Sequence, residues 1–258
     1  MKAAIRRLAE RLSGRYRRLL ARQFGRRLYR MRNDRPFISF TFDDFPVSAL
    51  TTGGGILERY GLAATFYASM GLMGQDAPAG RLFSPADLKA LVAAGHELGC
   101  HTFSHSHAWD TPSRVFEESL LENQRALSNL LPGEVFRTMS YPIGCPRPET
   151  KRATAKHFAC CRGGGQRFNV GSIDLNYLSA YFLEQDVDGV GSVWSVLDRS
   201  CREAGWLILA THDVCDQPSP FGCTPEFFEE VVRYTVRSGA IILPVGQAWE
   251  LIRKGHGC

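Results

Sequence analysis

From Pro36 onward the sequence alternates short apolar runs with segments of helical pattern, and this alternation constrains the fold more than any other feature. Phe37–Phe42 and Trp206–Thr211 are the clearest apolar runs, and both have the length and composition of buried strands. Ser84-Pro85 and Thr224-Pro225 are typical N-caps of the helical segments. Repeated strand–helix units predict an α/β fold with a mostly parallel sheet covered by helices. The number of units favours a barrel over an open sheet.

The same reasoning assigns the shorter elements. Further strands are expected at Ala64–Met70, Glu97–His101, Val135–Ser140, Phe158–Cys161, Leu178–Leu183 and Ala240–Leu243. A Gly-rich turn and the segment Ile56–Tyr60 separate the first two strands, and further helices are expected at Ser113–Leu131, Ser192–Glu203 and near Gln247–Arg253.

Composition excludes several classes of protein. No apolar run approaches the roughly 20 residues of a membrane-spanning helix. The eight cysteines form no CxxC pair, which argues against a zinc ribbon, and a dense disulfide framework is not expected in a chain of this length. The first 20 residues lack the apolar core of a secretion signal. We therefore expect a cytoplasmic protein with mostly reduced thiols, either free or peripheral at the inner face of the membrane.

Positive charge is concentrated at the N-terminus. Residues 1–35 hold 13 Lys and Arg against two acids, whereas residues 36–258 hold 18 basic and 24 acidic side chains. Apolar side chains recur at helical spacing in the first segment, at Leu8, Leu12, Leu19, Leu20 and Phe24. We therefore expect a basic helical extension, residues 1–35, in front of a catalytic barrel, residues 36–258. Its leucines could pack on the barrel, or it could bind anionic lipid. Binding to an anionic glycan or to nucleic acid is less favoured, and the mildly acidic remainder predicts no nucleic-acid partner.

Two adjacent carboxylates, Asp43 and Asp44, follow the first apolar strand in the segment TFDDFP. In a parallel barrel the C-terminal ends of the strands form the face on which active sites are built. A buried carboxylate pair needs a cation, whereas an exposed pair could simply close a turn. The segment alone leaves both interpretations open.

Histidines follow two other predicted strands. His101 and His105 lie in HTFSH, and a spacing of four residues would place both imidazoles on one face of a helical turn, where they could bind one metal ion. His212 follows Trp206–Thr211 in LATHD, where it could transfer a proton or serve a structural role. The segment SYPIG, with Tyr141, Pro142 and Ile143, ends another strand in a turn that could direct backbone N–H groups at a ligand oxygen.

Taken in order, TFDD, HTFSH, SYPIG and LATHD resemble the motifs of the polysaccharide deacetylase family, which includes chitooligosaccharide and peptidoglycan deacetylases. The resemblance runs from about Pro36 to Arg253. It implies a distorted (β/α) barrel of seven or eight mostly parallel strands that binds one divalent metal ion, usually Zn²⁺.

The resemblance also implies a role for each matching residue. Asp44, His101 and His105 would be the metal ligands. Asp43 would be the general base for the attacking water, and His212 the general acid for the leaving amine. The backbone near Ile143, with Tyr141 and Pro142, would bind the acyl oxygen.

Two features depart from the family pattern, since the family's Asp-Trp motif is not evident and one arginine is missing. Many members carry an arginine four residues before the motif glycine, where it orients the catalytic aspartate, and this chain has Ser140 there. Arg162, which follows a later strand, could supply the missing guanidinium or could be structural.

From the resemblance we expect hydrolysis of an N-acetyl group on an amino sugar of a glycan, glycolipid or polysaccharide precursor. An O-deacetylase or a deformylase is the enzymatic alternative, since the same metal site suits an ester or a formamide. The alternative of another class is a non-catalytic protein that binds a glycan or is recruited to a membrane.

Overall fold

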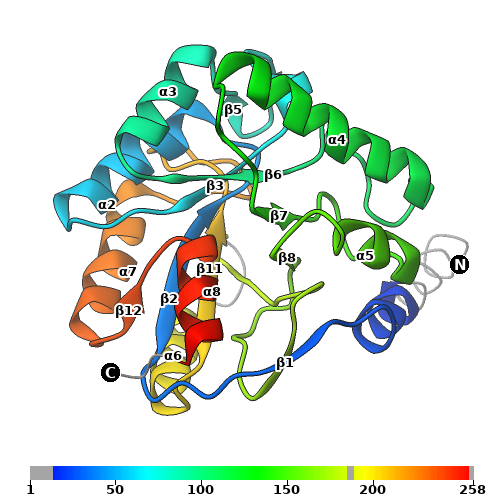
Figure 1. The fold of residues 1–258 in the computed structure, drawn as a ribbon. Coiled ribbons are helices and arrows are strands. Elements are labelled where there is room, and N and C mark those ends of the chain that lie inside the picture. Colours follow the sequence, from blue (N-terminus) through cyan, green and yellow to red (C-terminus); the bar gives the residue numbers. More distant parts are fainter. Residues whose placement is uncertain (1–13, 185–188, 256–258) are drawn as a thin grey trace, which may run out of the picture.

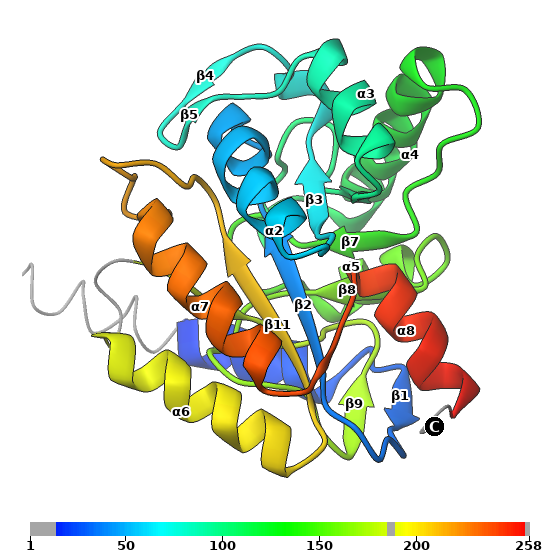
Figure 2. The ribbon, with the colours of Figure 1, turned by 90° about the vertical axis from the view of Figure 1, so that its left-hand side faces the viewer.

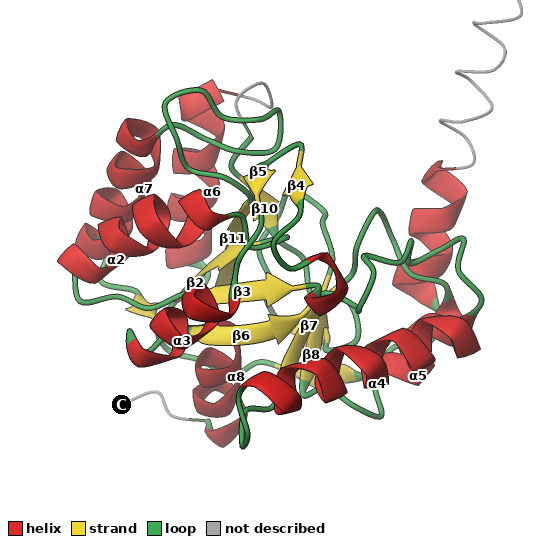
Figure 3. Cartoon of the chain, turned by 90° about the horizontal axis from the view of Figure 1, so that it is seen from above, coloured by secondary structure: helices red, strands yellow, loops and turns green. Residues whose placement is uncertain are grey.

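The computed structural model describes residues 14–184 and 189–255. Within this part of the chain the central feature is one eight-stranded, wholly parallel sheet, with strand order β10-β11-β2-β3-β6-β7-β8 and β12 paired to β2. It confirms the predicted α/β class and curls into a distorted, incomplete barrel (Figures 1 and 3). Its strands are β2 (Phe37–Phe42), β3 (Thr65–Ala68), β6 (Glu97–Cys100), β7 (Thr138–Ser140), β8 (Cys160–Arg162), β10 (Tyr181–Phe182), β11 (Trp206–Thr211) and β12 (Ile241–Ile242).

Strand β2 explains part of the distortion. One of its edges pairs with β11 along all six residues, and the two strands lie side by side in Figure 2. Its other edge is divided, because β12 pairs with Phe37 and Ile38 whereas β3 pairs with Thr41 and Phe42. Two strands therefore share one edge. Between the outer strands β8 and β10, Leu178 continues the hydrogen bonding by donating its N–H to Cys161 O at 2.8 Å.

Helices surround the curved sheet, as Figure 3 shows from above. They are α2 (Gly55–Arg59), α3 (Pro85–Ala93), α4 (Ser113–Leu130), α5 (Pro148–Thr154), α6 (Gly189–Arg202), α7 (Pro225–Arg237) and α8 (Val245–Lys254). The predicted N-caps are present, since Ser84 forms a capping box with Asp87 and Thr224 accepts a hydrogen bond from Phe227 N. No helix in the described ranges is both long enough and apolar enough to cross a bilayer.

Aromatic side chains join the sheet to its helices. Phe42 stacks on Phe66 with ring centroids 4.6 Å apart and contacts Phe228 of α7 at 5.6 Å. The predicted Gly-rich turn beside this cluster is instead a π-helix, Ala49–Gly54. Gly53 allows this close packing, because a Cβ there would come within 2.8 Å of the Phe42 ring.

The basic segment differs from the expectation in two ways. It is helical at residues 14–23, but β1 (Leu28–Arg30) is a strand that pairs antiparallel with β9 (Ser172–Asp174). Leu19 and Phe24 do not pack on the barrel, since their exposed fractions are 56% and 54%. Leu8 and Leu12 lie outside the described residues. The leucine spacing predicted the helix but not the face that it buries.

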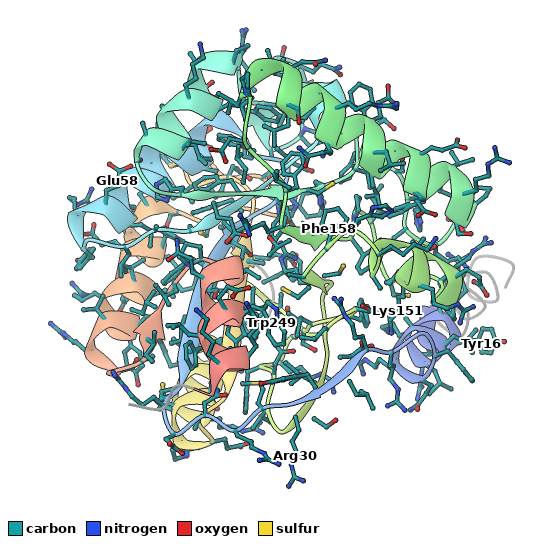
Figure 4. All side chains as sticks on the ribbon, viewed as in Figure 1. Tyr16, Arg30, Glu58, Lys151, Phe158 and Trp249 are labelled. Carbon is teal, nitrogen blue, oxygen red and sulfur yellow. The ribbon has the colours of Figure 1, made fainter. Side chains whose placement is uncertain are left out.

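Polar contacts dock the N-terminal helix (residues 14–23) on the barrel. The buried Lys151 Nζ donates to Ala21 O at 2.6 Å and to Phe24 O at 2.9 Å, and pairs with Asp174 Oδ2 at 2.6 Å. A cation at a helix C-terminus also interacts favourably with the helix dipole. In Figure 4, Lys151 lies where α5 meets this helix, and Tyr16 points away from the barrel.

Candidate metal and catalytic site

The predicted site residues meet at the C-terminal edge of the sheet. Asp43 and Asp44 follow β2, His101 follows β6, and His212 follows β11. Arg162 is the last residue of β8. Because these strands are parallel members of one sheet, segments far apart in sequence converge at one edge.

Three side chains form a group that could hold a metal ion. One donor atom from each of Asp44, His101 and His105 lies within 4.8 Å of the other two. Asp44 Oδ1 is 3.5 Å from His101 Nε2 and 3.2 Å from His105 Nε2. Donor atoms around a tetrahedral Zn²⁺ are about 3.3 Å apart, given bonds of about 2.0–2.1 Å. The spacing therefore suits shared coordination of one cation.

The state of these atoms also fits a cation. Asp44 Oδ1 is buried and has no hydrogen-bond donor among the described residues. His101 Nδ1 donates to Ser140 O at 2.9 Å, which leaves Nε2 with its lone pair toward Asp44. Burial lowers the pKa of His101 to about 4, with opposing effects from Asp43 and Asp44, so the imidazole is neutral at pH 7. A neutral imidazole is the form that binds metals.

The backbone around the ligands is unusual. Asp44 and His105 have φ values of 61° and 53°, and Thr102 has 62°. Non-glycine residues adopt this left-handed region infrequently, and such conformations cluster at functional sites. The prediction that HTFSH forms a helical turn was wrong, because residues 101–105 are a loop. This loop brings the two imidazoles together through local turns instead of helical spacing.

Asp43 is held by Arg162 in a buried ion pair. The Arg162 guanidinium also lies 4.8 Å from the centroid of the Tyr67 ring. Burial raises the pKa of Asp43, but the charges of Arg162, His101 and His212 outweigh it and hold this pKa well below the usual range. Asp43 is therefore ionised at neutral pH. Arg162 lies 119 residues after Asp43 in the sequence. It contacts Asp43 in the way expected of the arginine that Ser140 replaces.

His212 faces the same site from the other side of β2. Its Nε2 lies 3.9 Å from Asp44 Oδ2, and its Nδ1 lies 3.2 Å from Phe221 O. A hydrogen bond from Nδ1 to this carbonyl directs Nε2 toward the site. The rings of Phe182 and Phe221 lie 6.5 Å and 5.4 Å from the imidazole.

The three residues of SYPIG that were predicted to bind a ligand differ in whether they are available to do so. Ile143 has a φ of 45° and lines the cavity, and its N–H donates no hydrogen bond within the described residues. Tyr141 also lines the cavity, but its hydroxyl is 2.6 Å from Thr154 Oγ1 and donates to Asn176 O at 3.1 Å. Pro142 is not among the lining residues, and its carbonyl accepts from Ala108 N. Of the three, only the Ile143 N–H is free to bind a ligand.

A cavity of about 800 Å³ contains these groups. Several of its lining side chains were not predicted from the sequence, because they come from loops and from the basic segment. Those additional residues include Arg17, Arg18, Arg22, Trp109, Tyr177 and Phe221.

Comparison with known proteins identifies related chains. The family model described as "Polysaccharide deacetylase" matches residues 30–159. A gellan lyase from a Bacillus species is 26% identical over 125 residues, which are 48% of this chain but only 5% of that protein.

Solved structures share the fold. A family 4 acetyl xylan esterase from Clostridium thermocellum, in complex with a cobalt ion, is 19% identical with a TM-score of 0.58, covering 83% of this chain and 91% of that one. A mutant of the peptidoglycan deacetylase PdaC from Bacillus subtilis is 20% identical with a TM-score of 0.55, covering 86% and 93%. The CE4 family pseudoenzyme BA3943 from Bacillus anthracis is 16% identical with a TM-score of 0.56, covering 86% and 68%.

Proposed function

This chain belongs to the polysaccharide deacetylase family, and from that premise we propose that it removes an N-acetyl group from an amino sugar of a glycan, glycolipid or polysaccharide precursor. The observation that carries the proposal is the convergence of Asp44, His101 and His105 beside Asp43 and His212. Acyl hydrolysis needs an electrophile for the carbonyl oxygen, a base for water and an acid for the leaving group, and this edge offers all three.

Asp44, His101 and His105 would hold the metal ion. Two imidazoles and one carboxylate suit Zn²⁺ and leave coordination positions open, so we propose Zn²⁺ as the ion. When bound, it polarises the acyl carbonyl and lowers the pKa of water. The unpaired, buried Asp44 Oδ1 and the neutral His101 support this assignment.

Asp43 is the proposed general base. Arg162 binds its Oδ1 and keeps the carboxylate ionised and fixed, which leaves Oδ2 to accept a proton from the attacking water. The water oxygen then bonds to the acyl carbon, and negative charge develops on the carbonyl oxygen. The free N–H of Ile143 is placed at the cavity wall, where it could donate to that oxygen.

His212 is the proposed general acid. With Nδ1 fixed by Phe221 O, protonated Nε2 donates its proton to the amine nitrogen as the carbon–nitrogen bond breaks. Acetate and a free amino sugar leave. Phe182 and Phe221 flank the imidazole and limit the access of other water to it.

The test is acetate release from N-acetylated sugars, measured with and without a chelator. Asp43→Asn should reduce turnover by about 10²–10⁴-fold, the usual contribution of proton transfer, and should leave metal content unchanged. Turnover that survives chelation, or that is unaffected by Asp43→Asn, contradicts the proposal.

Ester hydrolysis is a second candidate for the same residues. The fold shared with an acetyl xylan esterase supports it, and an alkoxide could accept the His212 proton as an amine does. Acetate and formate release from defined N-acetyl, O-acetyl and N-formyl sugars separates the deacetylase from the O-deacetylase and the deformylase.

The non-catalytic alternative has a precedent in fold, since BA3943 is a pseudoenzyme. The presence here of Asp43, its Arg162 partner and His212 argues for catalysis, because a pure binding protein needs no acid–base pair. Glycan binding without turnover on all three acyl types would favour the binding protein.

We also propose that the protein is cytoplasmic and contacts anionic membranes through the N-terminal helix. Tyr16 and Leu19 are exposed on it and Phe24 directly after it, among arginines, a composition suited to a lipid interface. Leu19→Glu with Phe24→Glu should weaken binding to phosphatidylglycerol vesicles. The matched control is Val115→Glu, on exposed α4 surface. Deleting residues 1–35 is a poor test, because it removes β1 and part of the cavity wall.

A further inference from the structure

One wall of the catalytic cavity is cationic. It is formed by the N-terminal helix (residues 14–23), from which Arg17, Arg18 and Arg22 line the cavity that also contains Asp43 and His212. Arg18 and Arg22 are four residues apart and therefore lie on the same face of the helix. A charged helix face thus borders the reaction centre.

This orientation follows the usual one only in part. A surface helix ordinarily turns its apolar stripe toward the core and its charged side toward solvent. Here Ala21 is buried, but Tyr16 and Leu19 are exposed, with exposed fractions of 60% and 56%. Three arginines of the helix, Arg17, Arg18 and Arg22, line the cavity instead. The hydrophobic effect alone does not favour this arrangement, so other interactions must hold it.

Polar docking at the end of the helix supplies those interactions. Lys151 binds the carbonyls of Ala21 and Phe24. Gly25 follows Phe24 and has a φ of 62°. A Cβ at this position would lie only 2.6 Å from Pro148 O, so only glycine allows this close approach. Asn176 Nδ2 donates to Gly25 O at 3.0 Å. These contacts fix which face of the helix meets the cavity.

The cationic face lacks compensating carboxylates. The only acidic side chains among the described lining residues are Asp43 and Asp44. Asp43 pairs with Arg162, and Asp44 is a candidate metal ligand. Within residues 14–184 and 189–255, no carboxylate forms an ion pair with Arg18 or Arg22.

Further guanidinium groups crowd the same region. Arg22 Nη2 lies 3.4 Å from the position of a Cβ on Gly165, in the loop after Arg162. Burial lowers the pKa of Arg167, and the charge of Arg22 lowers it further. Arg17 is partly compensated, since its Nη1 is 3.4 Å from Asp110 Oδ1. Like charges held together raise the free energy of the unliganded site, and an anion would relieve the repulsion.

We propose that Arg18 and Arg22, assisted by Arg17, bind a phosphate group of the substrate, so that the enzyme acts on an amino sugar that carries a phosphate ester and not on a neutral glycan. The proposal rests on the proposed function, because it assigns the substrate class of that same cavity. Phosphate offers several acceptor oxygens and up to two charges, and guanidinium groups bind it in bidentate geometry. A carboxylate has only two oxygens and one charge, which suits a single arginine better.

Binding tests the anion site without turnover. The full chain is treated with chelator, because phosphate is itself a metal ligand, and is titrated calorimetrically with N-acetylglucosamine 1-phosphate and with N-acetylglucosamine. We expect the phosphorylated sugar to bind at least about tenfold more tightly, as hydrogen bonds to charged groups are the stronger ones. Arg18→Gln with Arg22→Gln should abolish the difference, and inorganic phosphate should compete.

Arg15→Gln is the matched control, since Arg15 is an exposed arginine on the same helix that does not line the cavity. Arg18→Lys with Arg22→Lys keeps the charge and should retain part of the preference. Equal affinity for the two sugars, or a preference that survives the double Gln variant, overturns the proposal. Tighter binding of an N-acetylated disaccharide that carries a uronate carboxylate than of the sugar phosphate would also overturn the proposal.

Kinetics of the metal-loaded enzyme distinguish a soluble sugar phosphate from a lipid-linked one as the source of the phosphate. The ratio of kcat/KM on phosphorylated over neutral substrate is measured for a soluble sugar phosphate and for a polyprenyl phosphate-linked sugar in detergent. The double Gln variant should lower this ratio by about tenfold or more, whereas Arg15→Gln should leave the ratio unchanged. A variant that merely misfolds would lose activity on both substrates and keep the ratio. If the chain binds phosphate but hydrolyses no acyl group, the proposed function is refuted and the anion site is kept. If it hydrolyses phosphorylated and neutral substrates equally well, the anion site is refuted and the proposed function is kept.

Discussion

Two half-buried carboxylates at opposite ends of the sheet show how a structural acid differs from a functional one. Glu97 begins β6 and accepts hydrogen bonds from Thr138 Oγ1 at 2.6 Å, Gly246 N at 2.8 Å and Thr65 Oγ1 at 3.3 Å. Asp44 Oδ1, at the C-terminal edge, is buried without a donor. A buried carboxylate oxygen without a donor is unfavourable unless a cation binds it. The satisfied acid stabilises the fold, and the unsatisfied one indicates a ligand.

The histidines at the two ends of β6 repeat this contrast. His96 precedes the strand, and both of its nitrogens have protein partners, Ala64 N at 3.0 Å and Glu58 Oε1 at 3.4 Å. His101 follows the strand, and only its Nδ1 is bound by a backbone carbonyl. The hydrogen-bond partners therefore distinguish His96, a structural imidazole, from His101, a candidate metal ligand.

The largest expected effect is on metal binding and turnover, when Asp44, the carboxylate whose Oδ1 lacks a donor, is replaced. Asp44→Ala should abolish stoichiometric metal binding and lower turnover by about 10³-fold or more, because the cation contributes several kcal/mol to the transition state. Metal analysis and acetate release measure the two losses. Folding should be retained, since the substitution removes an uncompensated buried group. A variant that keeps both metal and turnover would contradict the assignment of Asp44.

The converse substitution should affect stability and not metal binding. Glu97→Ala leaves the donors of Thr138 and Gly246 without their acceptor, and we expect the free energy of unfolding to fall by about 3 kcal/mol. Urea unfolding measures it. Metal content should stay at the wild-type level, and loss of metal would show that the two ends of the sheet are coupled.

Metal removal should sharpen the comparison. A ligand that binds only the folded state at 100 times its Kd raises the free energy of unfolding by about 2.7 kcal/mol. Zn²⁺ should therefore stabilise the wild type by that amount, and Glu97→Gln to a similar extent, but not Asp44→Ala. Equal stabilisation of all three chains would mean that the ion binds elsewhere.

The smallest effect concerns pH. Burial raises the pKa of Glu97, so the folded state holds this proton more tightly than the unfolded state does. Its favourable contribution is present below the ordinary glutamate pKa of about 4.3 and is lost as pH rises through the folded pKa. Subtracting the pH profile of Glu97→Gln from that of the wild type should give a difference in unfolding free energy that declines over this range. A flat difference would contradict it.

Much of the architecture follows from local pattern. Strands such as Phe37–Phe42 and Trp206–Thr211 were predicted with their observed bounds, because continuous apolar runs between turns have few alternatives. The short strands were predicted too long; Val135–Ser140 became Thr138–Ser140. Strand β1 was missed, because its pairing with β9 lies more than 140 residues away.

The sequence alone determined the chemistry at the strand ends. Asp43, Asp44, His101 and His212 each follow an apolar run, and parallel strands bring such positions to one edge whatever their separation in the chain. Their convergence could therefore be expected before any coordinates.

Only the tertiary structure decided what surrounds that chemistry. It placed Arg162 against Asp43 and left Asp44 Oδ1 without a donor, because a buried charge depends on partners from distant strands. It also turned Arg18 and Arg22 into the cavity, against the helical periodicity of the basic segment. Periodicity records which side chains share a face, whereas Lys151 and Gly25 fix where that face points, and both interactions exist only in the folded chain.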